Sequence, residues 1–419
     1  MNILIVSPGV YPVPAIKGGA VENLIEMLIK NENITKKHKI TVYTVYENKI
    51  EELTKNIKCE FKFIKTNSIS YQFKRIVRHI INRLSRIYIG NQYIHTVEKQ
   101  LEKEKNLYDI IIIENEPQYG LILKKVKGKA KLILHLHNDY LNIDTRNARQ
   151  IKDCYDRIFS ISKYISDRVN AIDANNSNSK VFYNGIDTNR FNTQRYDMKN
   201  LRKKYGFKEN DFIFMYSGRL AKEKGIKELI EAFCGINNQN AKLLIVGKKQ
   251  PGQEQFYNNI LNLSKRKKDN IIFKGYIEYD VIPELYSLVD VGVIPSVCNE
   301  AFGLSLVEFL ACGKPVIVSN RGALPEILKD SECGEIAECN DNYVENLKEK
   351  MLYFLNIEKK RMEKLRKEAI EKSRKYSKEI YINNFLNLIE EETNGKYDHM
   401  QSTATGKETE TGSTQMAEP

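Results

Sequence analysis

The stretch from Pro295 to Pro315, PSVCNEAFGLSLVEFLACGKP, decides the fold of this chain. An apolar run ending at Pro295 predicts a buried strand, and the pattern from Gly303 to Ala311 predicts a helix. The short loop between them carries Glu300, and Glu308 follows eight positions later on the helix. A strand, a tight loop and a helix whose first free N–H groups point back at the loop form a seat for an anion.

The two carboxylates of this stretch suit hydroxyl groups, because an anion at the helix start would repel them. A ligand with a diphosphate in the middle and hydroxyl-bearing rings on both sides fits such an arrangement. A nucleotide sugar is a ligand of this kind, and the stretch therefore predicts a nucleotide-sugar site.

Apolar runs alternate with helical patterns along the rest of the chain, which predicts parallel α/β sheets with helices on both faces. The strands expected in the first half are 2–6, 39–45, 61–64, 110–113, 131–136, 157–160 and 180–182. Those expected in the second half are 212–216, 242–246, 271–273, 289–294 and 316–318. The turn sequence Asn184-Gly185-Ile186-Asp187 is the expected junction between the halves.

Four units follow from this organisation. Two Rossmann-like domains, 1–185 and 186–375, face each other across a cleft, and a helix over 376–394 returns to pack on the first domain. Residues 395–419 have almost no apolar side chains and predict a disordered tail. The step at His399-Met400 is typical of an expression tag rather than native sequence.

Composition limits the classes of function. The chain has 66 Lys and Arg against 54 Asp and Glu, a net charge of +12, which suits nucleic acid, an anionic membrane or a phosphorylated substrate. The alternation of aromatic and basic residues that stacks bases is missing, so we expect no nucleic-acid partner. Seven scattered cysteines without a CxxC pair predict free thiols in the cytoplasm and no metal site.

Two further loops carry suitable chemistry at the expected strand ends. Gly18 and Gly19 precede a helix and allow a close approach of backbone to a phosphate or a sugar, although such a pair is often only a turn. Arg219 and Lys224 bracket the loop after strand 212–216 and can both reach a diphosphate. Taken alone, these two cations favour a solvated surface over a binding site.

The strand 131–136 ends in the histidine-rich segment His135-Leu136-His137-Asn138-Asp139. Alternate residues of a strand share a side, so His135 and His137 lie together and only the later one has to emerge at the tip. We therefore expect a polar role in the cleft for His137, against the alternative of a purely structural histidine.

The glycine pair, the segment GRLAKEKG and the segment EAFGLSLVE, in this order, resemble the family 4 retaining glycosyltransferases of GT-B fold. The opening PVPAIKGGAVE is similar to the branch with spore-coat and surface-polysaccharide transferases. The resemblance covers the chain from Met1 to about Glu392. It departs from the family at Asn138, which stands where an Asp often follows the histidine.

The resemblance implies a role for each matching residue. Glu300 holds hydroxyls of the donor sugar, Glu308 those of the ribose, and His137 touches the sugar near the reacting carbon. Arg219 and Lys224 neutralise the leaving diphosphate. The remaining expected contacts come from Gly18, Gly19, Ile277 (backbone to the base), Phe302, Gly303 and Leu304.

The implied reaction is transfer of a sugar from a nucleotide-diphosphate donor, UDP-linked, to a polysaccharide or lipid-linked acceptor with retention of configuration. Two cations and a helix start stabilise the departing diphosphate, and no DxD pair stands at a strand-end loop, so we expect neither metal nor cofactor. The alternative is a nucleotide-sugar epimerase or hydrolase of the same architecture.

The segment 72–95 predicts a basic amphipathic helix, with apolar residues at helical spacing and cations between them. Such a helix can lie peripherally on the anionic inner face of a membrane. Periodicity alone equally allows an ordinary helix packed on the core with a solvated basic edge.

Overall fold

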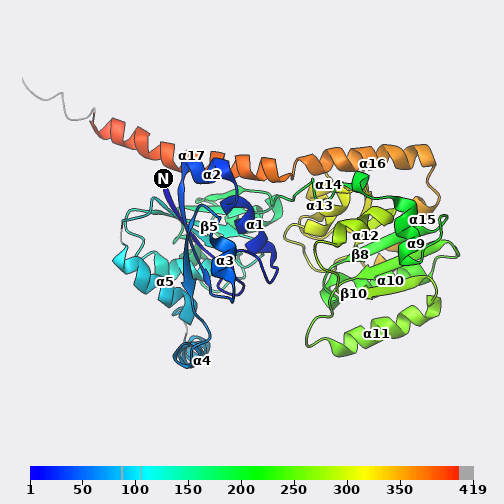
Figure 1. The fold of residues 1–419 in the computed structure, drawn as a ribbon, viewed down its shortest axis with the longest axis horizontal. Helices are drawn as coiled ribbons and strands as arrows, with labels where there is room; N and C mark the ends of the chain where they lie inside the picture. The colour runs from blue at the N-terminus through cyan, green and yellow to red at the C-terminus, as the bar shows by residue number, and fades with distance from the viewer. Residues whose placement is uncertain (86–87, 105, 405–419) are drawn as a thin grey trace, which may run out of the picture.

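The computed structural model describes residues 1–85, 88–104 and 106–404, and it contains two parallel β-sheets with helices on both faces (Figure 1). The first sheet has the strand order β3-β2-β1-β4-β5-β6-β7. Its strands are β1 (Asn2–Val6), β2 (Lys39–Val45), β3 (Glu60–Ile64), β4 (Ile110–Glu114), β5 (Lys131–Leu136), β6 (Arg157–Ser160) and β7 (Ser179–Val181). The prediction of a parallel α/β sheet is confirmed, with strand ends within one residue of those expected.

The second sheet repeats the plan with the order β10-β9-β8-β11-β12-β13. Its strands are β8 (Phe212–Ser217), β9 (Ala241–Val246), β10 (Ile271–Gly275), β11 (Val291–Ile294), β12 (Val316–Ser319) and β13 (Gly334–Ala337). The edge strand β13 was not predicted, because its sequence GEIA is short and contains no continuous apolar run.

Helices connect the strands and close both faces of the sheets. Those of the first half are α1 (Ala20–Ile29), α2 (Glu32–Lys37), α3 (Ile50–Thr54), α4 (Ile69–Leu84), α5 (Gln92–Lys103), α6 (Gly120–Leu123), α7 (Ala148–Lys152) and α8 (Lys163–Asn170). Those of the second are α9 (Met198–Tyr205), α10 (Ile226–Cys234), α11 (Glu254–Ser264), α12 (Ile282–Leu288), α13 (Leu304–Ala311), α14 (Leu324–Leu328), α15 (Tyr343–Leu355) and α16 (Lys359–Arg374). Helix α17 (Lys378–Ala404) follows them.

The central strands are fully buried because each contributes side chains to two cores. In β1, Leu4 and Val6 join one apolar cluster, whereas Ile3 and Ile5 join the cluster on the opposite face. This alternation follows from the two-residue repeat of a strand. A strand buried on both sides has to be a continuous apolar run, which is why these strands are readable from sequence.

The predicted helix 72–95 is wrong as a single element. The structure has α4 over Ile69–Leu84 and a separate α5 beginning at Gln92. Gly90, with a φ of 89°, and the capping side chain of Asn91 belong to the connection, and a left-handed residue stops a helix.

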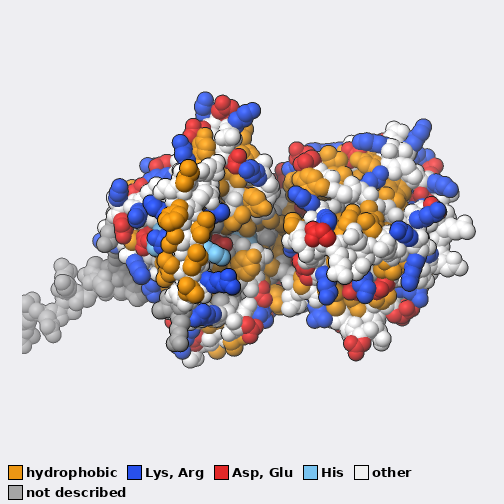
Figure 2. Space-filling view, turned by 90° about the horizontal axis from the view of Figure 1, so that it is seen from below, with side chains coloured by type: hydrophobic (Ala, Val, Ile, Leu, Met, Phe, Trp, Pro, Cys, Tyr) orange, Lys and Arg blue, Asp and Glu red, His pale blue; other side chains and the backbone are white. Residues whose placement is uncertain are grey.

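The alternative of a core-packed helix is also wrong, because no residue of α4 is buried. Figure 2, which views the molecule from below, shows apolar side chains bordered by Lys and Arg on the left lobe, where α4 lies. None of the helices in the described part of the chain is both long and apolar enough to span a bilayer.

Helix α17 returns to the first sheet, as predicted. The chain passes between the two sheets twice, side by side, since the amide of Ile186 donates to the carbonyl of Tyr376 at 2.8 Å. From there, Tyr381, Phe385 and Ile389 pack into the apolar cluster of β1 and β4. The helix continues to Ala404, so it overlaps the expected tail over residues 395–404, and residues 405–419 lie outside the described part.

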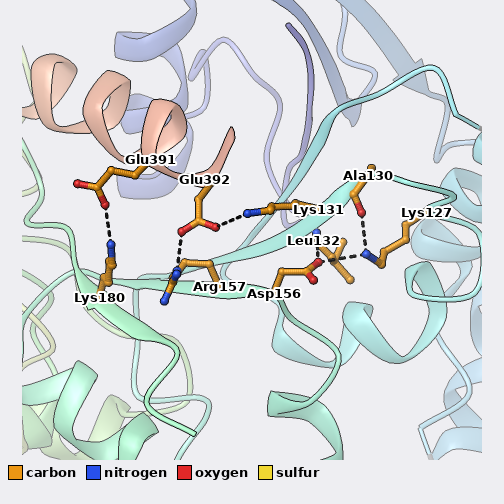
Figure 3. A network of polar contacts seen from close by, with 9 residues as sticks. All are labelled: Lys127, Ala130, Lys131, Leu132, Asp156, Arg157, Lys180, Glu391 and Glu392. Atoms are coloured by element: carbon orange, nitrogen blue, oxygen red, sulfur yellow. Dashed lines mark hydrogen bonds and ion pairs between the residues drawn. The ribbon is translucent and has the colours of Figure 1, made fainter. Parts of the chain in front are cut away.

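Ion pairs hold the middle of this helix (Figure 3). The carboxylate of Glu392 is buried and accepts hydrogen bonds from Arg157 Nε at 2.6 Å and Lys131 Nζ at 3.0 Å. The neighbouring Glu391 pairs with Lys180 at 2.6 Å but is largely exposed. Both pairs join α17 to strands of the first sheet.

We expect Glu392→Ala to lower the free energy of unfolding by about 1–3 kcal/mol, because it leaves two cations without their buried acceptor. Glu391→Ala is the matched control, with little effect, because exposed pairs contribute little. Urea unfolding followed by circular dichroism measures both. Equal effects of the two substitutions would contradict a structural role for the buried carboxylate.

Candidate active site

A cavity of about 680 Å³ lies between the carboxyl ends of the two sheets, and Figure 2 shows the hollow between the lobes. Ligands of α/β sheets bind at this edge. The cavity brings together eight of the predicted site residues: His137, Arg219, Lys224, Glu300, Phe302, Gly303, Leu304 and Glu308. His137 comes from the first half of the chain, and the other seven come from the second.

Glu300 is held from both its side chain and its backbone. Its Oε1 lies 2.6 Å from Lys224 Nζ, and it also accepts a hydrogen bond from the Ser296 hydroxyl. Its carbonyl accepts from the amide of Ala323 at 2.8 Å. Gly322, at a φ of 62°, leaves no room for a Cβ against the Glu300 backbone. The carboxylate is therefore fixed at the cavity wall with one cation already on it.

Arg219 stands on the loop that follows β8. Its carbonyl accepts a hydrogen bond from the Tyr216 hydroxyl at 2.7 Å, which anchors the backbone. Its guanidinium donates to Gln250 Oε1 at 3.0 Å and lies 3.8 Å from Glu223 Oε1, but it is 57% exposed. A group bound this loosely can turn toward an anion in the cavity.

The start of α13 also faces the cavity. Gly303 caps the helix at a φ of 99°, a conformation that favours glycine. The first bonded amide of this turn is that of Leu306, which donates to the Gly303 carbonyl at 3.0 Å. The earlier N–H groups of the turn are thus available to an acceptor in the cavity, as at other helix starts.

Glu308 is buried on α13 and is held by two tyrosines. Its carboxylate accepts from Tyr279 OH at 3.0 Å and from Tyr286 OH at 3.1 Å. Burial raises the pKa of Glu308 to about 6 in spite of these bonds. The tyrosines offer the hydroxyl contacts that a sugar ring would offer.

His137 belongs to a buried network that the sequence did not predict. Its Nε2 lies 2.9 Å from Glu114 Oε2, and that oxygen lies 3.0 Å from His135 Nδ1. The two histidines share a side, as expected, with ring centroids 4.0 Å apart. Asn115 fixes the backbone, because its Oδ1 accepts from the His137 amide at 2.9 Å.

Burial lowers the pKa of His137 to about 4, so the ring is neutral near pH 7. Burial acts to raise the pKa of Glu114, but His135 and His137 outweigh it and hold this pKa below its ordinary value. The network therefore presents a charged carboxylate that orients a neutral imidazole at the cavity.

The same three side chains offer ligand atoms within 4.8 Å of one another and could hold a metal ion. Glu114 Oε2 is, however, at hydrogen-bond distance from both imidazoles. These contacts already link the three side chains as a hydrogen-bonded triad, while the buried His135 Nε2 has no partner among the described residues.

Three predicted site residues lie outside the main cavity. Gly18, at a φ of 76°, lines a second cavity of about 610 Å³ with Tyr276 and Tyr279. Gly19 caps α1 beside the buried carboxylate of Glu22, whose pKa burial raises to about 7. Ile277 packs against the core and lines neither cavity.

Sequence reasoning missed Glu114, Glu22 and the two tyrosines on Glu308. A signal existed for Glu114, since it directly follows the apolar run of β4 and so stands at the ligand-binding edge. No local signal marks Tyr279 and Tyr286, because their contact with α13 depends on how α12 packs.

The chain is similar in sequence to known proteins over most of its length. The family model described as "Glycosyl transferases group 1" matches residues 197–376. Spore coat protein SA of Bacillus subtilis is 26% identical over 365 residues, 82% of this chain and 87% of that protein. The lipopolysaccharide 1,2-N-acetylglucosaminetransferase of Salmonella typhimurium is 24% identical over 352 residues, 79% of this chain and 83% of that one.

Solved structures share the fold. HepE of Anabaena, in complex with UDP and glucose, superimposes with a TM-score of 0.71 at 18% identity, over 93% of this chain and 100% of that one. Sucrose-phosphate synthase of Thermosynechococcus elongatus gives a TM-score of 0.71 at 17% identity, over 93% and 98% of the two chains.

The raised pKa of Glu308 predicts a stability gain on substitution. A carboxyl whose pKa rises from 4.5 to about 6 on folding destabilises the folded protein at a pH above 6, by up to about 2 kcal/mol. We expect Glu308→Gln to raise the melting temperature at pH 7.5, with the difference nearly gone by pH 4.5, where wild-type Glu308 is protonated in the folded state. The exposed Glu349→Gln is the control, and a gain that did not vary with pH would contradict this account.

Proposed function

Because this chain belongs to the group 1 glycosyltransferases, of the family 4 type with the GT-B fold, we propose that it is a retaining hexosyltransferase. It takes the sugar from a UDP-linked donor and passes it to a polysaccharide or lipid-linked acceptor without a metal ion. The observation that carries this proposal is the cluster of Lys224, Glu300 and Arg219 beside the start of α13. It combines cations for a diphosphate with carboxylates for hydroxyls in one cavity.

A UDP donor is supported by the fold neighbours, since HepE structures hold UDP, UDP with glucose, and UDP-glucose. In this proposal the ribose hydroxyls bind the Glu308 carboxylate, where Tyr279 and Tyr286 now donate. The backbone near Ile277 contacts the base, on the side where Tyr276 and Tyr279 line the second cavity.

The charged groups act on the leaving diphosphate. Breaking the bond between the anomeric carbon and the phosphate oxygen leaves negative charge on the diphosphate and oxocarbenium character on the sugar. Arg219, Lys224 and the N–H groups of Gly303 and Leu304 stabilise that negative charge. Glu300 holds the sugar hydroxyls, and its pairing with Lys224 keeps both groups in place before the donor binds.

The acceptor attacks the same face of the sugar that the diphosphate leaves. A new bond forms between the acceptor oxygen and the anomeric carbon, and the acceptor proton passes to the departing phosphate. His137 stands at the sugar end of the cavity as a neutral hydrogen-bonding group oriented by Glu114. It does not need to take the proton.

The acceptor and the compartment are also proposals. The Salmonella relative is named for action on lipopolysaccharide, which supports a glycan acceptor in cell-surface polysaccharide synthesis. All seven cysteines are free thiols, which supports a reducing, cytoplasmic setting.

We expect Lys224→Met and Arg219→Met each to lower kcat by about 10²–10³-fold, the usual loss when one group stabilising a developing anion is removed. The matched control is Lys222→Met, on the same loop but lining a different cavity, with kcat unchanged. Release of UDP from each donor gives the rates, and a UDP-induced thermal shift in each variant reports donor binding. Full turnover in Lys224→Met would overturn the assignment.

Retention and metal independence are tested together. We expect proton NMR of the early product to show the anomeric configuration of the donor, and EDTA to leave the rate unchanged, because protein cations replace a metal at the diphosphate. An inverted product would contradict the retaining mechanism. Loss of activity in EDTA, restored by a divalent ion, would contradict the proposal that no metal ion is needed. Free or epimerised sugar with no acceptor product would favour the epimerase or hydrolase alternative.

A further inference from the structure

Helix α4 exposes the apolar face that an amphipathic helix normally buries. Its neighbour α5 buries Tyr93, Ile94, Val97 and Leu101, whereas α4 buries no residue. The exposed apolar side chains of α4 include Ile69 at 90%, Leu84 at 80% and Phe73 at 68%, together with Ile76, Val77, Ile80 and Ile81. An apolar surface of this kind marks an interaction site.

The way α4 is attached turns this face outward. Asn82 donates to the Gly90 carbonyl at 3.0 Å and accepts from the Ile89 amide at 2.8 Å, and Arg78 donates to Gln92 at 3.2 Å. Arg78 and Asn82 are one helical turn apart, so they lie on one face, toward the domain. The residues Phe73, Ile76, Ile80 and Leu84 recur at the same kind of spacing on the opposite face.

The charge of α4 has one sign. Its sequence ISYQFKRIVRHIINRL contains four Lys and Arg residues and no Asp or Glu. Cations around an apolar face are complementary to a bilayer that carries anionic lipids: the apolar side chains enter the acyl boundary and the cations stay at the headgroups. A second copy of this chain, with a net charge of +12, is not complementary to such a basic border.

A basic cavity lies beside the helix. It measures about 480 Å³, and its cationic lining comprises Arg75 and Arg83 from α4 and Arg146 from the loop after β5, with His79 beside them. In the described part of the chain, none of these four side chains forms an ion pair with an acidic residue. Glu116 also lines the cavity, and burial raises its pKa to about 7, so its neutral form can stand beside an anion.

The basic cavity shares a loop with the main cavity of about 680 Å³, called the donor cavity below because it takes the donor in the proposed function. Residues His137 to Tyr140 line the donor cavity, and Arg146 and Asn147 of the same loop line the basic cavity. Both therefore lie along the carboxyl edge of the first sheet, next to one another in the path of this loop.

We propose that α4 and the basic cavity form a docking site for an anionic membrane, in which the apolar face of α4 enters the bilayer and the cavity takes a phosphate group of a membrane lipid. The site goes beyond the donor chemistry. It rests on the proposed function in one respect: a sugar acceptor carried by a lipid phosphate would be presented to the donor cavity from this membrane.

The test is co-flotation with vesicles of phosphatidylcholine containing 30 mol % phosphatidylglycerol, against vesicles of phosphatidylcholine alone. We expect the wild-type protein to bind the anionic vesicles and Arg75→Ala/Arg83→Ala to bind them about 30-fold more weakly. Each cation at the surface contributes ~1 kcal/mol, and 1.4 kcal/mol corresponds to a factor of ten in affinity. Phe73→Ser/Ile80→Ser removes apolar side chains without a change of charge and is also expected to weaken binding. Lys359→Ala/Lys360→Ala on α16 is the charge-matched control, with binding unchanged.

Arg146→Gln separates the cavity from the helix, since this residue is not on α4. We expect it to weaken vesicle binding about fivefold, on the same scale of ~1 kcal/mol for one cation, and the neighbouring Arg149→Gln to leave binding unchanged. Failure of the wild-type protein to bind anionic vesicles would overturn the proposal. Unchanged vesicle binding by Arg146→Gln would overturn the role of the basic cavity. A UDP-induced thermal shift is measured in every variant to report donor binding separately from vesicle binding. Loss of the thermal shift would count against the proposed function, whereas loss of vesicle binding alone would not.

Discussion

Parallel pairing of β8 with β11 is the constraint on which the site depends. Gly292 of β11 lies opposite Met215 of β8, so both strands end at the same edge of the sheet. The loops that follow them bring Lys224 and Glu300 within 2.6 Å, although 76 positions separate them in sequence. The close packing of Phe309 over Gly292 then sets α13 against the same strand, so a cation, a carboxylate and a helix start converge.

The two sheets are held as one molecule by the course of the chain. The chain crosses between them at Ile186 and returns at Tyr376, and the two crossings are hydrogen-bonded to each other. Gly185 has no space for a side chain against Tyr381, so α17 starts directly on this crossing.

The buried charges of the site oppose stability. Glu308 and Glu22 lie where burial raises their pKa, and the buried Glu114 is kept ionised by hydrogen bonds from two histidines. Structural contacts elsewhere offset such costs, for example Glu392 with its two cations on the first sheet. Sites of function commonly concentrate perturbed titratable groups in this way.

The sequence by itself determined the alternating architecture and the loops of the site. Strands buried on both faces are continuous apolar runs, and glycine, cation and carboxylate patterns at their ends mark an anion seat, so Arg219, Lys224, Glu300 and Glu308 were readable. Only the tertiary structure decided which groups surround them. Glu114 meets His137 through the register of β4 on β5, and Tyr286 meets Glu308 through the packing of the separate helix α12. It also decided that α4 faces solvent, because a periodic pattern encodes an apolar face but not what covers it.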